Sequence, residues 1–229
     1  MHFGIILAAL LLPFTGLPTF ASPLNDWEVS CKVDRGSVQK KRRNWYFQTS
    51  KNYCVGGVFK QRAELYSDPI KPTHKGSYLF QTQFQIDTNS SQEFSVFSIH
   101  DARDGCAPPF QLFITPRGGM YVSSDIKLGP GEQCDRGTFG QRANSGIKRD
   151  GTPYDLKILV SFDGKGAFDG TVWLNDVVQI QDRYEPPNRP DAIISKKFYF
   201  KHGVYSRNVF PYKAVSSKMR VKRVRLKTQ

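Results

Sequence analysis

The sequence predicts an all-β domain of the sandwich or barrel type, and three observations support this prediction. Many short runs alternate between apolar and polar residues, turn-forming Gly, Pro, Asn and Asp separate these runs, and no long stretch has helical periodicity. The length of 229 residues also fits a single β-sandwich or barrel with a sizeable core. We therefore expect one domain over residues 22–229, with little helix.

The first 21 residues have the features of a signal peptide. Although they contain no Lys or Arg, they carry an apolar run from Phe3 to Pro13 and end in small residues suited to signal-peptidase cleavage. A membrane anchor is the alternative, but the run is shorter than the ~20 apolar residues that a spanning helix needs, and no later segment is long enough. We therefore expect residues 1–21 to be removed and the mature protein to be secreted or periplasmic, with no membrane span.

The four cysteines are Cys31, Cys54, Cys106 and Cys134, an even number in a chain with features of export, which favours disulfides. Three pairings are compatible with the sequence, and closure of the shorter loops favours Cys31 with Cys54 and Cys106 with Cys134. No Cys-x-x-Cys pair and no nearby His pair supports zinc, so we expect no metal bound by these thiols. The scattered Asp residues form no recognisable calcium loop, so no cofactor is predicted and a structural calcium ion stays open.

The charge balance predicts an anionic partner. The chain has 33 Lys and Arg against 20 Asp and Glu, a formal net charge of +13, so its surface attracts polyanions. Acidic polysaccharide, nucleic acid and an acidic membrane surface all satisfy this condition, but the features of export disfavour nucleic acid. The basic run 40–43 beside Trp45 and Tyr46 could imitate a base-stacking surface, yet packing inside a β-sandwich explains those aromatic residues better.

The clearest strand spans residues 78–86. Its even-numbered positions carry Tyr, Phe, Thr, Phe and Ile, whereas its odd-numbered positions carry Leu and three Gln, so one face packs and the other is mainly amide. A glutamine face is commonly a wet exterior, yet a concave sheet that binds sugar hydroxyls would have the same pattern. On the second interpretation, Gln83 is a candidate substrate-binding residue.

The other strands are predicted by the same alternation between turn residues. Residues 125–151, which are rich in Gly and polar side chains, predict a long loop over the sheet. The expected strands are a meander of 93–100, 110–115 and 120–123, a hairpin of 154–162 and 170–180, and two later strands at 196–205 and 218–226.

Three short segments place polar side chains together on one strand face. In the segment 199–205, the glycine leaves a spot without a side chain where a ligand could approach closely, whereas His202 points to the core with its apolar neighbours and is interpreted as structural. The side chains that share a face in each segment are Arg62 and Glu64, then Ser98 and His100, then Tyr199, Lys201, Gly203 and Tyr205.

These segments resemble motifs of the jelly-roll polysaccharide lyases. Arg62-Ala63-Glu64-Leu65 is similar to the Arg-x-Glu-Leu element of alginate lyases, Ser98-Ile99-His100 stands where that family has Gln-Ile-His or Gln-Val-His, and residues 199–205 resemble its Tyr-Phe-Lys-x-Gly-x-Tyr signature. Some other stretches resemble the heparin lyase I-like group more than the alginate lyases. These are residues 99–101 together with 108–109, and residues 170–175. The likeness runs from Arg62 to the C-terminus, and three motifs in the family's order are more specific than any one of them.

The resemblance implies a single-domain β-jelly-roll, a concanavalin-like sandwich with a concave substrate groove, acting as a monomer. The implied activity is cleavage of a 4-linked uronic-acid polysaccharide of the alginate, glucuronan or heparin/heparan type by β-elimination. Arg62 would neutralise the sugar carboxylate, because its planar guanidinium pairs with a carboxylate. His100 would act as the base or as a donor to the carboxylate, depending on the C5 epimer, and Tyr205 would protonate the leaving oxygen.

The resemblance also assigns the neighbouring residues. Glu64 would orient Arg62, whereas Tyr199 and Lys201 would bind substrate. Ser98 departs from the family glutamine, and its hydroxyl is too short to reach a sugar carboxylate as an amide would, so substrate class or carboxylate neutralisation differs here.

Two alternatives from other functional classes were weighed. A non-catalytic, lectin-like module for acidic polysaccharide would use the same sandwich, because a fold does not guarantee activity. Hydrolysis by paired carboxylates is disfavoured, because no Glu-x-Asp-x-x-Glu array is present and Glu64 alone cannot supply both acid and base.

Overall fold

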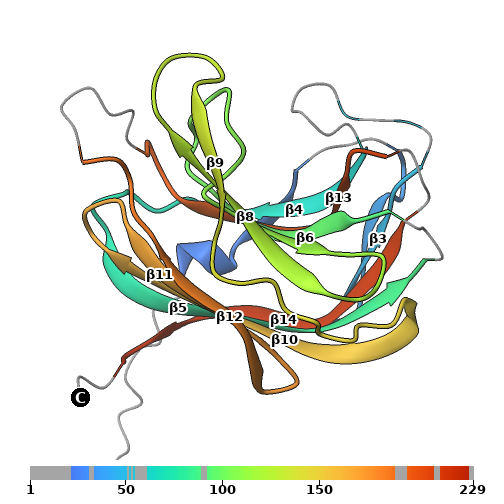
Figure 1. The fold of residues 1–229 in the computed structure, drawn as a ribbon. Helices are drawn as coiled ribbons and strands as arrows, with labels where there is room; N and C mark the ends of the chain where they lie inside the picture. Colours follow the sequence, from blue (N-terminus) through green and yellow to red (C-terminus); the bar gives the residue numbers. More distant parts are fainter. Residues whose placement is uncertain are drawn as a thin grey trace, which may run out of the picture.

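A computed structural model describes residues 22–30, 34–50, 52, 54, 61–88, 92–188, 195–208 and 212–226. The predicted signal peptide, residues 1–21, lies outside the described residues. Within these ranges the protein is a sandwich of two seven-stranded antiparallel sheets, with one short 3-10 helix, η1 (Pro23–Asn25) (Figure 1). The all-β jelly-roll predicted from the sequence is therefore confirmed.

Sheet A carries the three lyase-like motifs. Strands that are far apart in the sequence are neighbours in both sheets, as jelly-roll crossovers require. The order in sheet A is β1 (Trp27–Val29), β4 (Gln61–Ser67), β13 (Tyr199–Ser206), β6 (Phe94–His100), β7 (Phe110–Ile114), β8 (Met120–Lys127) and β9 (Cys134–Thr138).

Sheet B forms the lower layer in Figure 1. Its two longest strands, β10 and β5, pair along nearly their whole length. The order in sheet B is β12 (Val177–Tyr184), β11 (Phe168–Leu174), β10 (Asp150–Asp163), β5 (Lys75–Asp87), β14 (Lys213–Val224), β3 (Asn44–Gln48) and β2 (Val38–Lys41).

The core fills the space between the sheets, and the predicted alternation decides which residues enter it. On β5 the even-numbered residues 78–86 are buried and the glutamines on the other face are not. Aromatic rings contribute much of this core. The ring of Phe97 in sheet A lies 4.8 Å from that of Phe80 in sheet B, measured between centroids. Such contacts between the sheets fix the position of one sheet against the other.

His202 is a core residue, as the alternation predicted. Its side chain is fully buried, with Nδ1 2.8 Å from the carbonyl oxygen of Val96 and Nε2 in a hydrogen bond with the Ser216 hydroxyl. Because a carbonyl only accepts, Nδ1 carries the proton and Nε2 accepts from Ser216. Burial is the cause that lowers the pKa of His202 to about 4.

Two sequence predictions about strand boundaries were wrong. Residues 170–180 form two strands, β11 and β12, because Asn175 and Asp176 have φ angles of 48° and 65° and form the tight turn between them. The predicted loop 125–151 contains the end of β8, the short strand β9 and the start of β10. Strand β9 pairs with β8 and forms the edge of sheet A, so its polar composition reflects an exposed edge.

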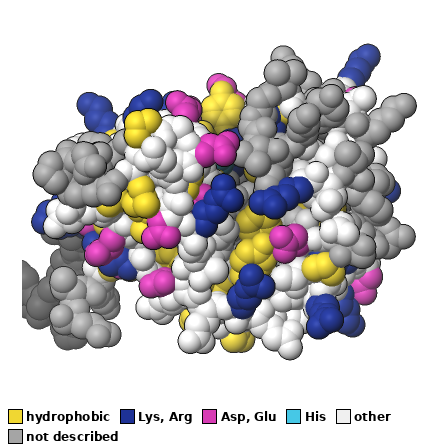
Figure 2. All heavy atoms as spheres, turned by 45° about the horizontal axis from the view of Figure 1, so that its top comes forward, with side chains coloured by type: hydrophobic (Ala, Val, Ile, Leu, Met, Phe, Trp, Pro, Cys, Tyr) yellow, Lys and Arg dark blue, Asp and Glu magenta, His cyan; other side chains and the backbone are white. Residues whose placement is uncertain are grey.

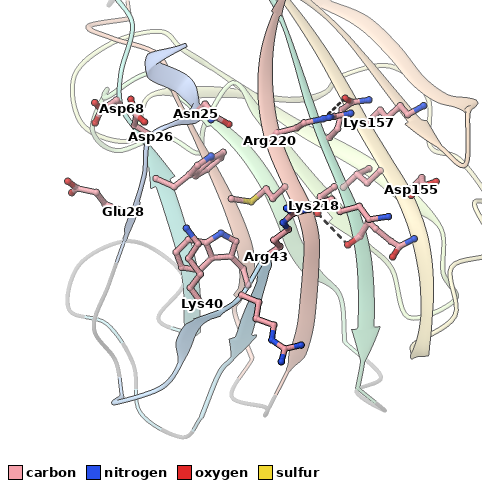
Figure 3. A pocket seen from close by; sticks show the side chains of 18 residues that line it. Asn25, Asp26, Glu28, Lys40, Arg43, Asp68, Asp155, Lys157, Lys218 and Arg220 are labelled. Atoms are coloured by element: carbon pink, nitrogen blue, oxygen red, sulfur yellow. Dashed lines mark hydrogen bonds between the residues drawn. The ribbon is translucent and has the colours of Figure 1, made fainter. Parts of the chain in front are cut away.

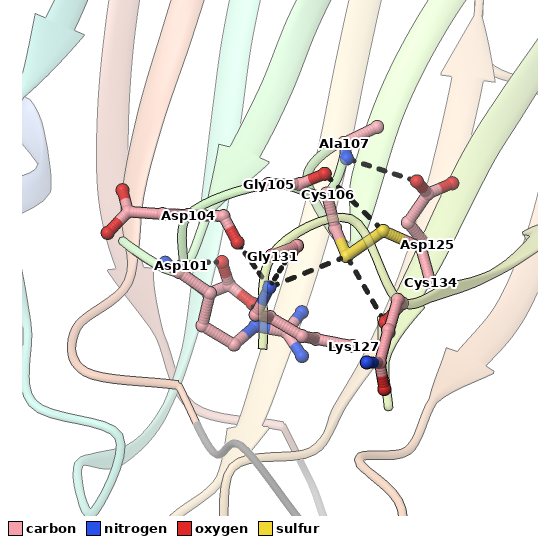
Figure 4. Close-up of a disulfide and its surroundings, with 11 residues drawn as sticks. Asp101, Asp104, Gly105, Cys106, Ala107, Asp125, Lys127, Gly131 and Cys134 are labelled. Carbon is pink, nitrogen blue, oxygen red and sulfur yellow. Dashed lines mark hydrogen bonds and ion pairs between the residues drawn. A yellow bond between two sulfur atoms is a disulfide. The ribbon is translucent and has the colours of Figure 1, made fainter. Parts of the chain in front are cut away.

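The predicted disulfide between Cys106 and Cys134 is confirmed, with a Cα–Cα distance of 5.8 Å. It ties the loop after β6 to β9 (Figure 4). The buried Lys127 donates from Nζ to the carbonyl oxygens of Asp104 and Gly131 and so fastens the same region. Cys31 lies outside the described residues, so its pairing with Cys54 stays a prediction. None of the described cysteines is a free thiol.

Candidate functional site

The fold brings the three predicted motifs onto adjacent strands of sheet A. Strand β13 lies between β4 and β6, and each motif is on one of these strands. The residues in register across the strands are Tyr205 with Arg62, Gly203 with Glu64, Lys201 with Ser98, and Tyr199 with His100. Their side chains project from the outer face, because the alternate residues of the same strands are buried in the core.

Arg62 links the two ends of this group. Its guanidinium carbon lies 5.9 Å from the centroid of the Tyr205 ring, a cation–π distance. The same guanidinium acts electrostatically on His100. Arg62 therefore lies near the Tyr205 ring and acts electrostatically on His100, although the three residues come from distant segments of the sequence.

The surroundings of His100 favour its neutral form. Its ring stacks on Tyr199 with 5.2 Å between centroids and 22° between planes. Burial first, and then the positive charges of Lys201 and Arg62, lower the pKa of His100 well below its ordinary value. At neutral pH the imidazole can therefore accept a proton or a hydrogen bond.

Glu64 lies between the two cations of the site. Its Oε2 is 3.7 Å from Nζ of Lys201, and its side chain is almost fully buried. Burial raises the pKa of Glu64, whereas Lys201 and then Arg62 oppose that rise. Glu64 was predicted to orient Arg62. In the structure Glu64 interacts with both cations, and its electrostatic interaction with Lys201 is the stronger of the two.

Gly203 has a structural reason to be glycine, and close approach of a ligand at this position stays a prediction. Its φ angle is 145°, and a Cβ at this position would lie 2.2 Å from the carbonyl oxygen of Ala63 and 2.8 Å from Cα of Glu64. The close packing of β13 against β4 therefore requires glycine here. The absence of a side chain needs no ligand to explain it.

Gln111 is a polar residue of this face that the sequence analysis missed. It lies on β7 in register with Ser98, so Lys201, Ser98 and Gln111 form one row across three strands. Its side chain is 3% exposed, and Nε2 has no hydrogen-bond partner among the described residues. Ser98 is also buried and its hydroxyl has no partner there. The Gln111 amide therefore lies on the strand next to Ser98, the position at which the alginate lyase motif has glutamine.

Gln83 does not lie with the other predicted site residues. It is on β5 of sheet B, in register with Asp155 and Ser217. The core separates this strand from the face that carries Arg62, His100 and Tyr205. The glutamine-lined face of β5 is thus the outer face of the second sheet and cannot line the same groove.

The surface around the motif sheet is mixed in charge. Figure 2 brings the top of Figure 1 forward and shows Lys and Arg side chains among acidic and hydrophobic ones. In the part of the chain that the structure describes, no group of three or more His, Cys, Asp or Glu side chains is placed to hold a metal ion, and no helix has the length and apolarity to span a bilayer.

Comparison with solved structures identifies the class of fold. An alginate lyase of polysaccharide lyase family 7 matches with a TM-score of 0.60 and 14% identity over 92% of this chain and 100% of that chain. An alginate lyase from Pseudomonas aeruginosa matches with a TM-score of 0.58 and 14% identity over 88% of this chain and 99% of that chain. One from Corynebacterium matches with a TM-score of 0.58 and 17% identity over 88% and 95%.

These matches establish the jelly-roll fold of alginate lyases and no more, because the identities are low. No model of a protein family matches the sequence, and no curated protein matches it. The reported structures do not bear on the likeness to the heparin lyase I-like group, which stays a prediction.

Proposed function

We propose that this chain is a secreted polysaccharide lyase that cleaves a 4-linked uronate polymer by β-elimination. The observation that carries the proposal is the junction of three motifs on adjacent strands, where Arg62 lies against Tyr205 and contributes to the low pKa of His100. A row of solvated strand residues has no need of a half-buried neutral imidazole beside two cations. Fold similarity to alginate lyases supports the same class of reaction.

The first chemical task is to neutralise the uronate carboxylate. While it keeps its charge, the proton on C5 is poorly acidic, because the carboxylate cannot delocalise the carbanion. The guanidinium of Arg62 pairs with a carboxylate and stays protonated throughout the relevant pH range. In our proposal Glu64 holds Lys201 and Arg62 in position and does not contact the sugar.

The second task is proton transfer. A base removes the C5 proton, the electron pair forms the C4–C5 double bond, and the C4–O4 bond breaks as an acid protonates O4. Neutral His100 is suited to be the base on the sugar face that it reaches, and the Tyr205 phenol is suited to be the acid. Where the C5 proton points to the other face, His100 contacts the carboxylate and Tyr205 performs both transfers, which requires Arg62 to stabilise its phenolate.

We propose that Gln111 supplies the amide that Ser98 cannot. A glutamine Nε2 carries two donors, and a buried donor without an acceptor is costly, so a sugar carboxylate over the Ser98 position would satisfy it. The short Ser98 side chain leaves room above β6 for the longer side chain of Gln111. This assignment explains how a motif without its glutamine keeps the same chemistry.

The Gln111 proposal is tested by moving the amide between strands. Gln111→Ala should lower kcat/KM by about 10- to 100-fold, the effect of losing one hydrogen bond to a charged group. The double variant Ser98→Gln/Gln111→Ala should recover most of that loss, whereas Gln181→Ala on the exposed face of β12 should change nothing. Full activity in Gln111→Ala would rule the role out.

Alginate is the first substrate to test, because the matched structures are alginate lyases. Mature protein, residues 22–229, is incubated with alginate, glucuronan, heparin and heparan sulfate, and the ultraviolet absorbance of the conjugated double bond is followed. Absorbance should rise on at least one polymer, and Tyr205→Phe should abolish that rise. Saturable binding without any shortening of the polymer would replace the lyase with a lectin-like module.

A further inference from the structure

A cleft with a volume of about 1100 Å³ lies away from the three motifs (Figure 3). It runs beside β14, between the β2–β3 hairpin and residues 25–28, and reaches β5 and β10 of sheet B. None of Arg62, His100 and Tyr205 lines it. The cleft is therefore separate from the proposed catalytic face.

Cationic side chains dominate the middle of this cleft. Of the six, Lys157 forms an ion pair with Asp176, whereas the other five form no ion pair with any described residue. Unpaired cations along one cleft repel one another and favour an anionic ligand. The six residues are Lys40, Arg42, Arg43, Lys157, Lys218 and Arg220.

The acidic residues of the cleft do not neutralise its middle. Asp26, Glu28 and Asp68 gather near one end, and Asp155 is on β10 near the other, with the cations of the hairpin and β14 between them in Figure 3. The separation of charge leaves a positive stretch across β14.

Two of these cations are held in a strained backbone conformation. Five described residues other than glycine have a positive φ, and Arg42 at 58° and Lys218 at 56° are both among them. Lys218 is in the bulge of β14 between Ser217 and Arg220, and a bulge redirects a side chain. Glycine or asparagine would adopt these conformations more easily. The positive φ of Arg42 follows from its place in the tight turn between β2 and β3, so Lys218 is the cation whose strained backbone points to a need for the side chain.

The neutral lining suits a sugar. Trp45 is half-buried, and the Lys40 ammonium lies 5.2 Å from its ring centroid. Gln81 and Gln83 project from the outer face of β5, where Gln81 already accepts a hydrogen bond from Nε of Arg220. Amides bind hydroxyl groups in both directions, and an indole offers an apolar face to a sugar ring.

We propose that this cleft is a second binding site, which holds another stretch of an acidic polysaccharide. Carboxylate or sulfate groups pair with Arg43, Lys218 and their neighbours, while the amides and Trp45 contact the neutral parts of the sugar. Nucleic acid is the weaker candidate, because one half-buried indole does not make the row of stacking surfaces that a single strand uses. The inference shares its ligand class with the proposed function but does not need catalysis.

A polymer long enough to reach both sites would gain effective concentration at the catalytic face. The second site should therefore matter for long chains and be silent for short oligosaccharides. In active protein, loss of the cleft cations should raise KM on polymeric substrate and leave kcat/KM on a tetrasaccharide unchanged.

The binding test uses Tyr205→Phe protein, so that elimination cannot consume the probe. Alginate oligosaccharides, heparin oligosaccharides and a single-stranded oligonucleotide are titrated separately. Arg43→Gln/Lys218→Gln should weaken binding of at least one of the two glycans by about tenfold or more, the loss of two charged contacts. Lys213→Gln/Lys222→Gln removes the same charge from exposed positions of β14 outside the cleft and serves as the matched control.

The two glycan probes separate carboxylate from sulfate recognition. Equal weakening in the cleft variant and the control would overturn the proposal, as would binding confined to the oligonucleotide. The assay needs no turnover, so the two proposals can fail separately. If the protein cleaves no uronate polymer but the cleft variant binds glycan more weakly than its parent, the proposed lyase activity is wrong and the cleft proposal is supported.

A single variant separates function from structure at the bulge. Lys218→Gly removes the ammonium and fits the observed φ, so it should raise the unfolding midpoint while it weakens glycan binding. A purely structural Lys218 would give the stability gain with unchanged binding, and that result would contradict the proposal.

Discussion

His100 and His202 lie on paired strands, but their side chains project from opposite faces of sheet A. His202 enters the core and is fixed by Val96 and Ser216, whereas His100 stacks on Tyr199 beside Lys201 and Arg62. Both have lowered pKa values, yet only His100 lies on the outer face of sheet A, where we propose that substrate binds. Strand alternation alone distinguishes the two roles.

If the proposed lyase activity is present, the charge of Lys201 should be visible in its pH profile. Lys201→Met removes one cause of the low His100 pKa, so the imidazole becomes protonated at a higher pH. In the proposed mechanism the neutral imidazole is the active form, so the acid limb of kcat/KM should move to higher pH. The position of the limb is read separately from its height, since Lys201 is also a proposed substrate-binding residue.

Lys213→Met, at an exposed position on sheet B, is the control for this shift. An acid limb that does not move in Lys201→Met would show that another group titrates in that limb.

His202 should make the fold sensitive to acid. Its pKa is about 4 in the folded protein against 6.5 for the ordinary group, so the unfolded chain takes up the proton first. Its contribution is present above pH 6.5 and is lost as the pH falls towards 4, by up to about 3 kcal/mol. The stability difference between the protein and His202→Gln should therefore shrink over this window.

Urea unfolding at several pH values measures that difference, and groups common to both proteins cancel, including the buried Glu64 and Asp101, whose raised pKa values act in the opposite direction. A difference that stays constant between pH 6.5 and 4 would contradict a buried neutral His202.

At the scale of elements, the alternation of apolar and polar residues predicted most strands correctly. Some strand boundaries were missed although turn-forming residues mark them. The buried face of β5 and the outward residues of β13 follow directly from period two. The Asn175-Asp176 turn was missed although both residue types favour a left-handed turn. An edge strand such as β9 has no buried face, so its sequence resembles a loop.

Pairing between strands explains the remaining failures in the site. Gln111 is in register with Ser98 only because β7 is the neighbour of β6, and nothing in either segment encodes that register. Gln83 was placed with the catalytic residues because its face is polar, but strand order assigns β5 to the other sheet. Motif residues within one strand were predictable, whereas residues that join the site from other strands were not.

The disulfide between Cys106 and Cys134 should stabilise the loop after β6 and the edge strand β9. Their separation of 28 residues corresponds to about 3 to 4 kcal/mol from the reduced entropy of the unfolded chain. Cys106→Ser/Cys134→Ser should lower the free energy of unfolding by that amount, measured with urea in the absence of reductant. An unchanged midpoint would mean that hydrogen bonds such as those of Lys127 hold the region by themselves.

At the scale of the whole molecule, the two sheets present different binding chemistry. Sheet A offers a neutral imidazole, a phenol and cations paired with Glu64, whereas the cleft beside sheet B offers unpaired cations with amides and an indole. A net charge of +13 draws polyanions to the molecule, but these local arrangements decide what each face does with them.

The central claim is that cleavage proceeds by elimination, and product analysis in heavy-oxygen water tests it most directly. An alginate oligosaccharide is digested in that solvent, and the masses of both fragments are compared with the mass of the parent. The account predicts fragments whose masses sum to that of the parent, with no heavy oxygen at the new ends and a double bond at the new non-reducing end. Saturated fragments whose masses sum to that of the parent plus one heavy water would demonstrate hydrolysis and contradict the account.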